Sequence, residues 1–254
     1  MNEDTVDILG KKVFFLYPSA MIKNTIIQEL IQQEYEVYVV KNHEALLRYL
    51  KRDSAAVVFI NINEGLDKVR WEEWVRSVLG SGGASQIRIG ILTNTNDDAL
   101  RNKFVSEIGV QCGFTVVKSD VSVALRQILE SLRVAEAKGR RKYLRAGKEI
   151  GASINLPMNN TFVNGQVKDI SAVGFSCVLD QNPTLAKNAL LQNIQLKLQG
   201  RILKVEGIVY GSRDEGQDRC YVFIFTQRVD SDTRAKIRES IQQHLQARMD
   251  EELK

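Results

Sequence analysis

Short runs of β-branched and aromatic residues alternate with amphipathic stretches in the first half of the chain. Five runs have the character of strands: KKVFFLYPS, YEVYVVKN, SAAVVFININ, QIRIGILTNT and CGFTVVKSD. Between them, apolar residues recur at helical spacing in four segments: Met21–Gln33, Glu44–Leu50, Trp71–Leu79 and Asp97–Ile108. Nearly continuous apolar strands that alternate with such helices indicate a parallel sheet covered on both faces. We therefore predict an α/β doubly wound domain of five βα units.

A further amphipathic helix is predicted from Asp120 to Lys138. Its apolar residues recur at steps of three and four and form one stripe: Val121, Leu125, Ile128, Leu132 and Ala135. Ser119 or Asp120 can cap its start, and Gly139 is well placed to end it. We expect the stripe to pack on the preceding sheet; the alternative is that it also seats a second protomer.

After Gly139 the pattern changes to successive short strands. Six segments show partial alternation and are separated by turn residues: GASINLPM, TFVNGQVKDI, GFSCVLD, NIQLKLQG, RILKVEGIVYG and RCYVFIFTQ. Without a helix among them, these strands predict an all-β antiparallel barrel, which leaves no open edge. A final helix from about Asp232 to Leu253 carries Ile237, Ile241, Leu245 and Met249 on one stripe. We predict two domains, residues 1–138 and residues 139–254.

Composition agrees with a soluble protein that has a real core. The chain has 254 residues, of which 44% are hydrophobic and 26% are charged. Its first residues, MNEDTVDILG, are acidic where a secretory signal would be positive, and no apolar run approaches the roughly 20 residues that span a bilayer. We therefore expect a cytoplasmic protein without membrane insertion.

The residues that carry most chemistry are sparse. Cys112, Cys177 and Cys220 are widely spaced, and only two histidines could join them in a metal site, so we expect buried thiols and no metal. No Ser-His-Asp or Cys-His arrangement and no cofactor motif is visible. We expect no catalytic residues, no cofactor and therefore no enzyme.

Over about residues 10–135 the spacing of strands resembles a response-regulator receiver domain. The resemblance implies acidic residues after the first strand that hold Mg²⁺, a phosphorylated Asp ending the third strand, a Thr or Ser ending the fourth and a Lys ending the fifth. Thr93 and Lys118 match the last two places. Tyr17 and Pro18, however, replace the metal-binding acids, and Asn61 replaces the phosphorylated Asp.

These departures predict a pseudo-receiver that does not accept phosphate. An amide cannot attack phosphorus as a carboxylate does, and a hard divalent ion prefers anionic oxygens. The roles that remain for this receiver-like domain are those of a scaffold, a dimer surface or a signal-coupled partner.

Positive charge is concentrated at the start of the second domain. Residues 1–138 contain 17 Lys and Arg against 18 Asp and Glu, whereas residues 139–254 contain 18 against 13. The stretch GRRKYLRAGK carries five cations and no carboxylate. An arginine guanidinium presents five donors in a planar fork, which suits a phosphate or the Hoogsteen edge of guanine. Arg141 and Arg145, with Arg140 as a third, lie on a segment that we expect to be flexible, so they could reach different parts of one anionic ligand.

A second polar element, KDISAVGF, follows where the strand-like FVNGQVKDI stops. Asp169 can accept the N1–H and N2–H₂ donors of guanine, and Ser171 can contact a base or a phosphate. Gly174 allows a backbone angle or a close approach that larger residues forbid. Together with the arginines, these residues could read both ends of a guanine nucleotide.

The pair R-x-x-x-R and D-x-S-x-x-G, at the start of a small antiparallel barrel, resembles the PilZ domain family of bacterial cyclic di-GMP receptors. The resemblance covers about residues 138–228, and no position of either motif departs from the pattern. It implies that the arginine loop wraps intercalated guanines and phosphates while the second motif holds a guanine on the barrel surface. The implied ligand-binding residues are Arg140, Arg141, Arg145, Asp169, Ser171 and Gly174.

We therefore predict a cyclic di-GMP-binding signalling effector. Ligand binding is expected to change its domain orientation or its contacts with a protein partner of unknown identity. The alternative is a nucleic-acid-binding regulatory protein that uses the basic barrel on phosphates. We favour it less, because aromatic residues such as Phe223 and Phe225 alternate as core residues do, whereas stacking of bases needs exposed rings.

Overall fold

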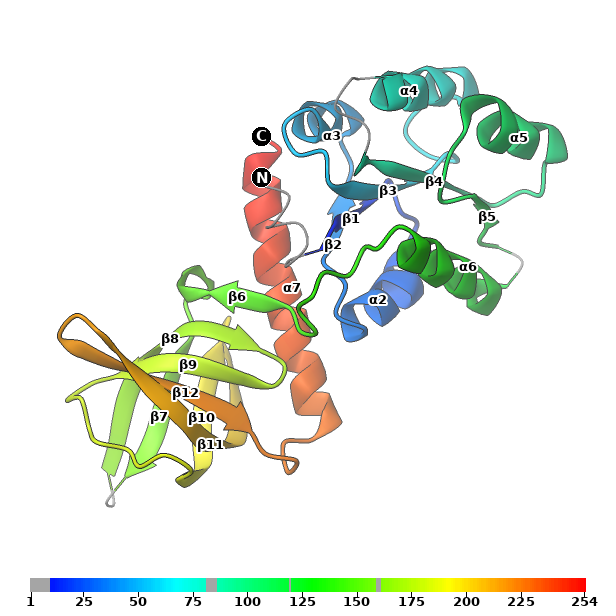
Figure 1. The fold of residues 1–254 in the computed structure, drawn as a ribbon. Helices are drawn as coiled ribbons and strands as arrows, with labels where there is room; N and C mark the ends of the chain where they lie inside the picture. Colours follow the sequence, from blue (N-terminus) through cyan, green and yellow to red (C-terminus); the bar gives the residue numbers. More distant parts are fainter. Residues whose placement is uncertain (1–9, 81–85, 119, 159–160) are drawn as a thin grey trace. The chain divides into compact units, whose positions relative to one another are not determined.

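The computed structural model describes residues 10–80, 86–118, 120–158 and 161–254 (Figure 1). By its internal packing the chain divides into two compact units. The first consists of residues 1–142 together with 246–254, and the second of residues 143–245. The domain boundaries expected from the sequence, 1–138 and 139–254, stay a prediction. Each unit is described by itself below.

The first unit contains a five-stranded parallel sheet in the order β2-β1-β3-β4-β5 (Figure 1). Its strands are β1 Lys12–Leu16, β2 Val37–Val40, β3 Ala56–Asn61, β4 Arg88–Thr93 and β5 Phe114–Val116. Every residue of the central strand β3 is buried, as expected where helices cover both faces of a sheet. The predicted α/β doubly wound fold is confirmed.

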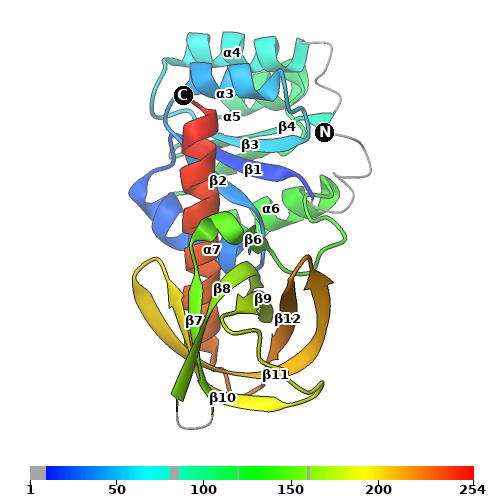
Figure 2. The same cartoon turned by 90° about the vertical axis from the view of Figure 1, so that its left-hand side faces the viewer.

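Helices lie on both faces of this sheet. They are η1 Ile22–Ile27, which is a π-helical segment, α2 Gln28–Gln32, α3 His43–Leu50, α4 Lys68–Gly80, α5 Asp98–Asn102, the π-helical η3 Lys103–Ile108 and α6 Val121–Val134. Figure 2 shows α3, α4 and α5 on one side and α2 and α6 on the other. Ile128 and Leu132 of α6 are fully buried in a core with Val13 and Phe15 of β1, so the stripe of α6 packs on its own sheet.

The two ends of α6 show which of the expected sequence signals determine where the helix begins and ends. The Asp120 side chain caps the start by accepting hydrogen bonds from the backbone N–H groups of Ser122 and Val123; Ser119 lies outside the described residues. The helix ends at Val134, so the expectation that it runs to Lys138 and stops at Gly139 was wrong. Glu136 takes a left-handed conformation with φ 50°. The Ala137 carbonyl accepts a hydrogen bond of 2.9 Å from the Lys11 N–H, which ties this segment to the residue before β1.

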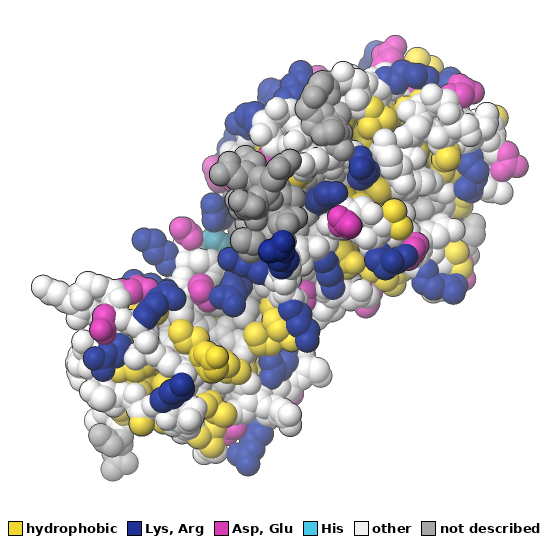
Figure 3. All heavy atoms as spheres, viewed as in Figure 1, with side chains coloured by type: hydrophobic (Ala, Val, Ile, Leu, Met, Phe, Trp, Pro, Cys, Tyr) yellow, Lys and Arg dark blue, Asp and Glu magenta, His cyan; other side chains and the backbone are white. Residues whose placement is uncertain are grey.

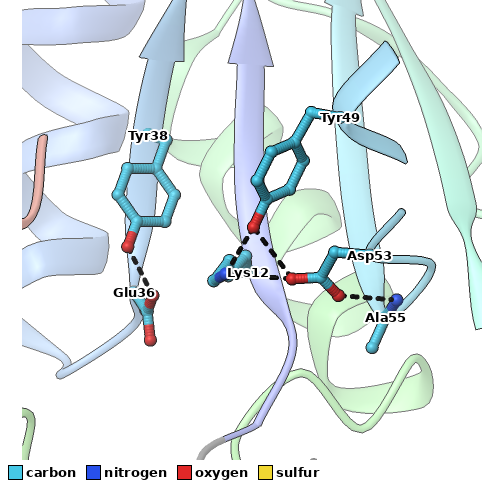
Figure 4. Close-up of polar contacts among 6 residues, drawn as sticks. All are labelled: Lys12, Glu36, Tyr38, Tyr49, Asp53 and Ala55. Carbon is cyan, nitrogen blue, oxygen red and sulfur yellow. Dashed lines mark hydrogen bonds and ion pairs between the residues drawn. The ribbon is translucent and has the colours of Figure 1, made fainter. Parts of the chain in front are cut away.

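Two groups of polar side chains lie at the amino ends of the first three strands (Figure 4). The Lys12 ammonium donates to the Tyr49 hydroxyl and lies 2.9 Å from the Asp53 carboxylate, which also accepts from Tyr49 at 2.8 Å. Burial opposes the charge of Asp53, but the bonds from Lys12 and Tyr49 lower its pKa overall. Nearby, the Tyr38 hydroxyl donates to Glu36, whose pKa is nevertheless raised by burial. The contacts of Lys12 and Tyr49 with Asp53 tie β1 and α3 to the segment before β3.

The second unit is a closed antiparallel barrel of six strands. They are β7 Ser153–Met158, β8 Thr161–Ser171, β9 Gly174–Leu179, β10 Leu190–Leu198, β11 Arg201–Glu215 and β12 Asp218–Phe225. They follow the order β8-β7-β10-β11-β12-β9, and pairing of β9 with β8 closes the barrel (Figure 1). A short strand, β6 Arg145–Gly147, pairs with the end of β8 and leads into a 3₁₀ turn, η4 Lys148–Ile150. The predicted barrel is confirmed, with β6 as an addition.

Alternating residues of the strands fill the barrel. Phe175 and Phe223 stack with their ring centroids 4.9 Å apart, and Cys177 is fully buried beside them. The predicted C-terminal helix is α7 Ser231–Glu252, and its Ile237 and Ile241 pack into the same core. Among the described residues, no helix is long and apolar enough to cross a bilayer.

The last turns of α7 belong to the first unit. There the Gln246 side chain accepts a hydrogen bond of 2.8 Å from the Val39 N–H and donates one of 3.0 Å to the Val39 carbonyl. An amide side chain satisfies in this way both backbone groups of a residue on β2, which is an edge strand of the sheet.

Candidate ligand-binding site

Pairing of β6 with β8 brings the two sequence motifs together. Arg145 lies opposite Ser171, and Gly147 lies opposite Asp169. Between them, Ala146 and Ile170 form a pair whose side chains are buried in the barrel core. Because side chains alternate along a strand, Arg145, Asp169 and Ser171 point away from the barrel core. Arg145 is exposed, whereas Ser171 is buried.

An ion pair joins the two motifs on this surface. Nη1 of Arg145 lies 3.6 Å from Oδ2 of Asp169, and the two side chains are 54% and 37% exposed. Such a long and solvent-accessible pair adds little to stability. Arg145 and Asp169 can therefore give up this contact and bind a ligand instead, at a small cost in free energy.

Ser171 and Gly174 close the hairpin between β8 and β9. They form the last pair of the ladder, with only Ala172 and Val173 in the loop. The Ser171 hydroxyl is buried and donates to the Gly174 carbonyl at 3.2 Å, while it accepts from the Val173 N–H at 3.4 Å. The serine of the motif thus fixes the turn that follows Asp169.

Gly174 is required by a close approach of backbone rather than by an unusual dihedral angle. It pairs with Ile224 of β12. A Cβ atom at position 174 would lie 2.1 Å from the Phe223 carbonyl oxygen, closer than any side chain can come. Any larger residue would push β9 away from β12 directly beneath the motif.

Arg140 and Arg141 lie in the irregular segment between α6 and β6, and both are exposed. By its packing the chain places them at the end of the first unit, whereas Arg145 belongs to the second. The expectation that Arg145 lies on a flexible segment was wrong, because it is the first residue of β6. The structure therefore joins Arg145, Asp169, Ser171 and Gly174 in one unit and leaves Arg140 and Arg141 in the segment that precedes it.

Residues that the motifs do not contain complete this surface. Ser176 pairs directly with Asp169 and with Val222 of β12, so the three lie side by side on the outer face. Lys168, at the irregularity of β8, and Arg213 of β11 both act on the Cys220 thiol. Burial raises the pKa of that thiol, while Arg213, Ser176 and Lys168 oppose the rise. A single polar residue within a strand carries no sequence signal that would have marked these positions.

Arg234 of α7 forms hydrogen bonds to the turn between β8 and β9. The Arg234 guanidinium donates to the carbonyls of Ala172 and Thr226 at 2.8 Å each and to that of Val229 at 3.1 Å. It also lies 6.0 Å from the centre of the Phe225 ring. Because Ala172 is inside the D-x-S-x-x-G motif, the turn and the first part of α7 are fixed to each other.

In the first unit, side chains occupy the position at which a receiver domain would have its phosphorylation site. Tyr17, which follows β1, is left-handed with φ 53°, and its hydroxyl lies 3.0 Å from Nδ1 of His43. Its ring touches Gly65 so closely that a Cβ there would lie 2.7 Å from it, and the Trp71 ring meets it edge-on. The buried Asn61 amide donates to the Tyr17 carbonyl at 2.9 Å. Side chains and hydrogen bonds thus fill the carboxyl end of the central strands.

Thr93 and Lys118 stand at two further positions of a receiver phosphorylation site. Thr93 is fully buried at the end of β4, with its hydroxyl 3.4 Å from that of Thr95. Lys118 is exposed after β5. Within the part of the chain that the structure describes, no cluster of three or more His, Cys, Asp or Glu could hold a metal ion.

Several solved structures match parts of this chain at low sequence identity. The PilZ domain of YcgR from Escherichia coli with c-di-GMP matches with a TM-score of 0.38 and 15% identity over 44% of this chain and 95% of that one. The K. pneumonia MrkH complex with c-di-GMP matches with a TM-score of 0.38 and 21% identity over 45% of this chain and 56% of that one. The chain thus spans about half the length of MrkH.

A third match is to a receiver protein from another organism. The chemotaxis response regulator CheY4 of Vibrio cholerae matches with a TM-score of 0.40 and 18% identity over 50% of this chain and 98% of that one. A search of the curated proteins found no match.

Comparison with protein families gives a match over residues 139–243, which includes β6, the whole barrel and the start of α7. The match is to the PilZ domain. It contains the R-x-x-x-R motif from Arg141 to Arg145 and the D-x-S-x-x-G motif from Asp169 to Gly174. Residues 139–243 of this chain thus match the PilZ domain, and a receiver-like α/β fold precedes them.

Proposed function

We propose that this chain is a cyclic di-GMP receptor that acts as a signalling effector. The observation that supports this most directly is the register of β6 on β8, which puts Arg145 opposite Ser171 and Gly147 opposite Asp169. Two motifs that are separated by more than twenty residues thereby meet on one outer surface of the barrel. The match of residues 139–243 to the PilZ domain, with both motifs complete, supports cyclic di-GMP as the ligand.

The chemistry of the two motifs suits a guanine nucleotide. Arg145 can exchange its 3.6 Å contact with Asp169 for a bidentate contact with a phosphate or a guanine edge. The Asp169 carboxylate then accepts the N1–H and N2–H₂ donors of a base. Arg140 and Arg141 add cations that can close over the ligand from the preceding segment, because they are exposed and only a few residues away.

The same surface offers an apolar floor for a purine. On the face of the barrel that carries β8, β9 and β12, hydrophobic side chains lie among Lys and Arg side chains (Figure 3). Ile224, which is 43% exposed, is paired with Gly174 at the end of the motif. A flat base can contact such a floor while arginines hold its phosphates.

We assign the chain a role in binding and not in catalysis. Ligand binding is proposed to alter the orientation of the two units or their contacts with a protein partner. The hydrogen bond from Arg234 to Ala172 supports this proposal, because it connects the motif turn to α7, whose last turns belong to the other unit.

Calorimetric titration of the purified chain tests the proposal. We expect saturable binding of cyclic di-GMP and at least tenfold weaker binding of cyclic di-AMP, GTP and cyclic AMP. A short oligonucleotide should compete only at low salt, if at all. Absence of cyclic di-GMP binding would contradict the proposal, and tight oligonucleotide binding that persists at physiological salt would favour a nucleic-acid-binding protein.

A further inference from the structure

Arg234, near the start of α7, gathers three backbone carbonyls around one guanidinium. Its Nη1 donates to the Ala172 carbonyl at 2.8 Å, its Nη2 to that of Thr226 at 2.8 Å and its Nε to that of Val229 at 3.1 Å. The three oxygens carry like partial charges, so a cation between them is favourable. A guanidinium offers each of them a donor of its own, whereas the ammonium of a lysine is a compact point charge.

The contact with Ala172 acts on a peptide group inside the D-x-S-x-x-G motif. The peptide that joins Ala172 to Val173 has both of its polar groups bonded. Its carbonyl accepts from Arg234 at 2.8 Å, and its N–H donates to the Ser171 hydroxyl oxygen at 3.4 Å. One peptide group is therefore held on both sides, by the arginine of α7 and by the serine of the motif.

The orientation of this peptide decides what the Ser171 hydroxyl does. The hydroxyl accepts from the Val173 N–H and directs its own hydrogen to the Gly174 carbonyl, 3.2 Å away. Ala172 is fully buried, and a buried carbonyl that loses its donor is costly. Without the guanidinium the peptide would therefore turn toward another partner and release the hydroxyl. Ser171 is also the partner of Arg145 in the ladder of β6 and β8, so the same turn sets the place of a motif arginine.

We propose that Arg234 is a positioning residue of the cyclic di-GMP site, which acts through the Ala172–Val173 peptide and does not touch the ligand; this inference rests on the proposed function. The fixed peptide holds the end of β8 in the arrangement that binds. Because the turn is already ordered, the ligand does not have to order it, and the affinity depends on a side chain of α7. The coupling is reciprocal, so bound ligand stabilises the first turns of α7.

A purely structural role of Arg234 has a different signature. An arginine that only stabilises the fold lowers the unfolding midpoint when it is replaced, but the protein that stays folded binds ligand with unchanged affinity. A positioning residue changes the affinity of the folded protein itself. Arg234→Lys makes this distinction measurable, because it keeps the positive charge and a donor and loses the fork that reaches three carbonyls.

Calorimetric titration of four proteins with cyclic di-GMP tests the inference, at a temperature where all four are folded. They are the wild type, Arg234→Lys and two controls. Ile194→Val removes a methylene from the buried core on β10, which neighbours neither β8 nor β9, so it destabilises the barrel away from the turn. Arg248→Lys makes the same change as Arg234→Lys at an exposed arginine of α7. We expect Arg234→Lys to weaken binding about tenfold and both controls to keep the wild-type affinity.

Hydrogen exchange of the wild type gives a readout that does not depend on any variant. Saturation with cyclic di-GMP should increase the protection of residues 232–238, because the turn and the start of α7 are coupled through the arginine. Unchanged exchange of these residues in the saturated wild type would overturn the inference. So would wild-type affinity in Arg234→Lys, or an equal loss of affinity in Ile194→Val. Failure of the wild type itself to bind would instead refute the proposed function, and the inference with it.

Discussion

Arg145 and Arg141 are held differently by the fold, yet the proposed site needs both. Arg145 is anchored in β6 and makes a half-exposed contact with Asp169, while Arg141 is exposed in the preceding segment. We predict that Arg145→Ala and Arg141→Ala each weaken cyclic di-GMP binding at least tenfold, because a hydrogen bond to a charged group contributes about 1.5–3 kcal/mol. Neither should lower the unfolding midpoint by more than a few degrees, since exposed ion pairs stabilise little.

A matched control exists on the same barrel. Arg219 is an exposed arginine of β12 whose Nε lies 3.4 Å from the Asp214 carboxylate, a contact comparable to that of Arg145. Arg219→Ala should leave the affinity unchanged in the same calorimetric titration. Unaltered binding in both Arg141→Ala and Arg145→Ala would show that the ligand site lies elsewhere.

Several single residues show where sequence information ends. The pattern of motifs marked Asp169, Ser171 and Gly174, and the contacts of Gly174 explain why that position excludes a side chain. The place of Ser176 beside Asp169 could not be read from the sequence, because it comes from the register of β9 on β8. Tyr17 was recognised as a departure from receiver domains, but that its ring packs on Gly65 depends on tertiary contacts.

At the scale of elements, the filled end of the parallel sheet has a chemical consequence. With Asn61 bonded to the Tyr17 carbonyl, we predict that incubation with acetyl phosphate and Mg²⁺ adds no phosphoryl group to residues 10–135. Asn61→Asp should also remain unmodified, because the acids that would hold Mg²⁺ are still missing and the Tyr17 ring still occupies the space. Intact-mass spectrometry gives the readout, and a gain of one phosphoryl group on a carboxylate of the wild type would contradict the prediction.

The amino end of the same sheet should respond to pH through Glu36. Burial raises the pKa of Glu36 above its ordinary value of 4.5, so the folded state holds this proton more tightly than the unfolded state. The free energy of unfolding should therefore fall as pH rises from about 4.5 through the raised pKa. Glu36→Gln keeps an acceptor for Tyr38 and removes the titration.

Urea denaturation between pH 4 and pH 8 measures this effect. We predict that Glu36→Gln and the wild type are similarly stable at the acidic end and that the variant becomes the more stable protein toward neutral pH. Glu44→Gln, at an exposed carboxylate in the first turn of α3, is the control and should not show a gain of this kind. A constant difference between Glu36→Gln and the wild type across the range would show that Glu36 titrates normally.

Elements were predictable where their own periodicity decides them. The five parallel strands and the six barrel strands each carry a run of apolar or alternating residues, and the structure forms all of them. Strand β6 was missed because Arg-Ala-Gly has no pattern and is a strand only through its pairing with β8. The end of α6 was misplaced because hydrogen bonds to the segment before β1, not the glycine at 139, determine where the chain leaves the helix.

At the scale of the whole molecule, the proposed ligand is expected to order the irregular segment that precedes β6. Residues 139–148 carry five cations, which repel one another until an anion binds. We predict that cyclic di-GMP increases protection from hydrogen exchange in residues 139–148 and 169–174 and changes it in residues 131–138 at the end of α6. A ligand shifts an equilibrium between arrangements only by its difference in affinity for them.

The same exchange experiment on Arg145→Ala supplies the control, since ligand should then change nothing. Small-angle scattering with and without ligand reports the arrangement of the units. If cyclic di-GMP saturates the wild type while residues 131–138 and the scattering profile stay the same, the units are independent and ligand does not couple them.

The helix α7 has a consequence for how the chain folds. Residues 143–245 are an insertion within the first unit, because the segment 246–254 returns to it and bonds to Val39 through Gln246. With the barrel unfolded, that return would close a flexible loop of about 100 residues, at an entropic cost on the order of 4 kcal/mol. A folded barrel replaces this loop by a body whose ends are already fixed. Whatever keeps the barrel folded thus helps residues 246–254 to find their place, so the two units share part of their stability through the connectivity of the chain.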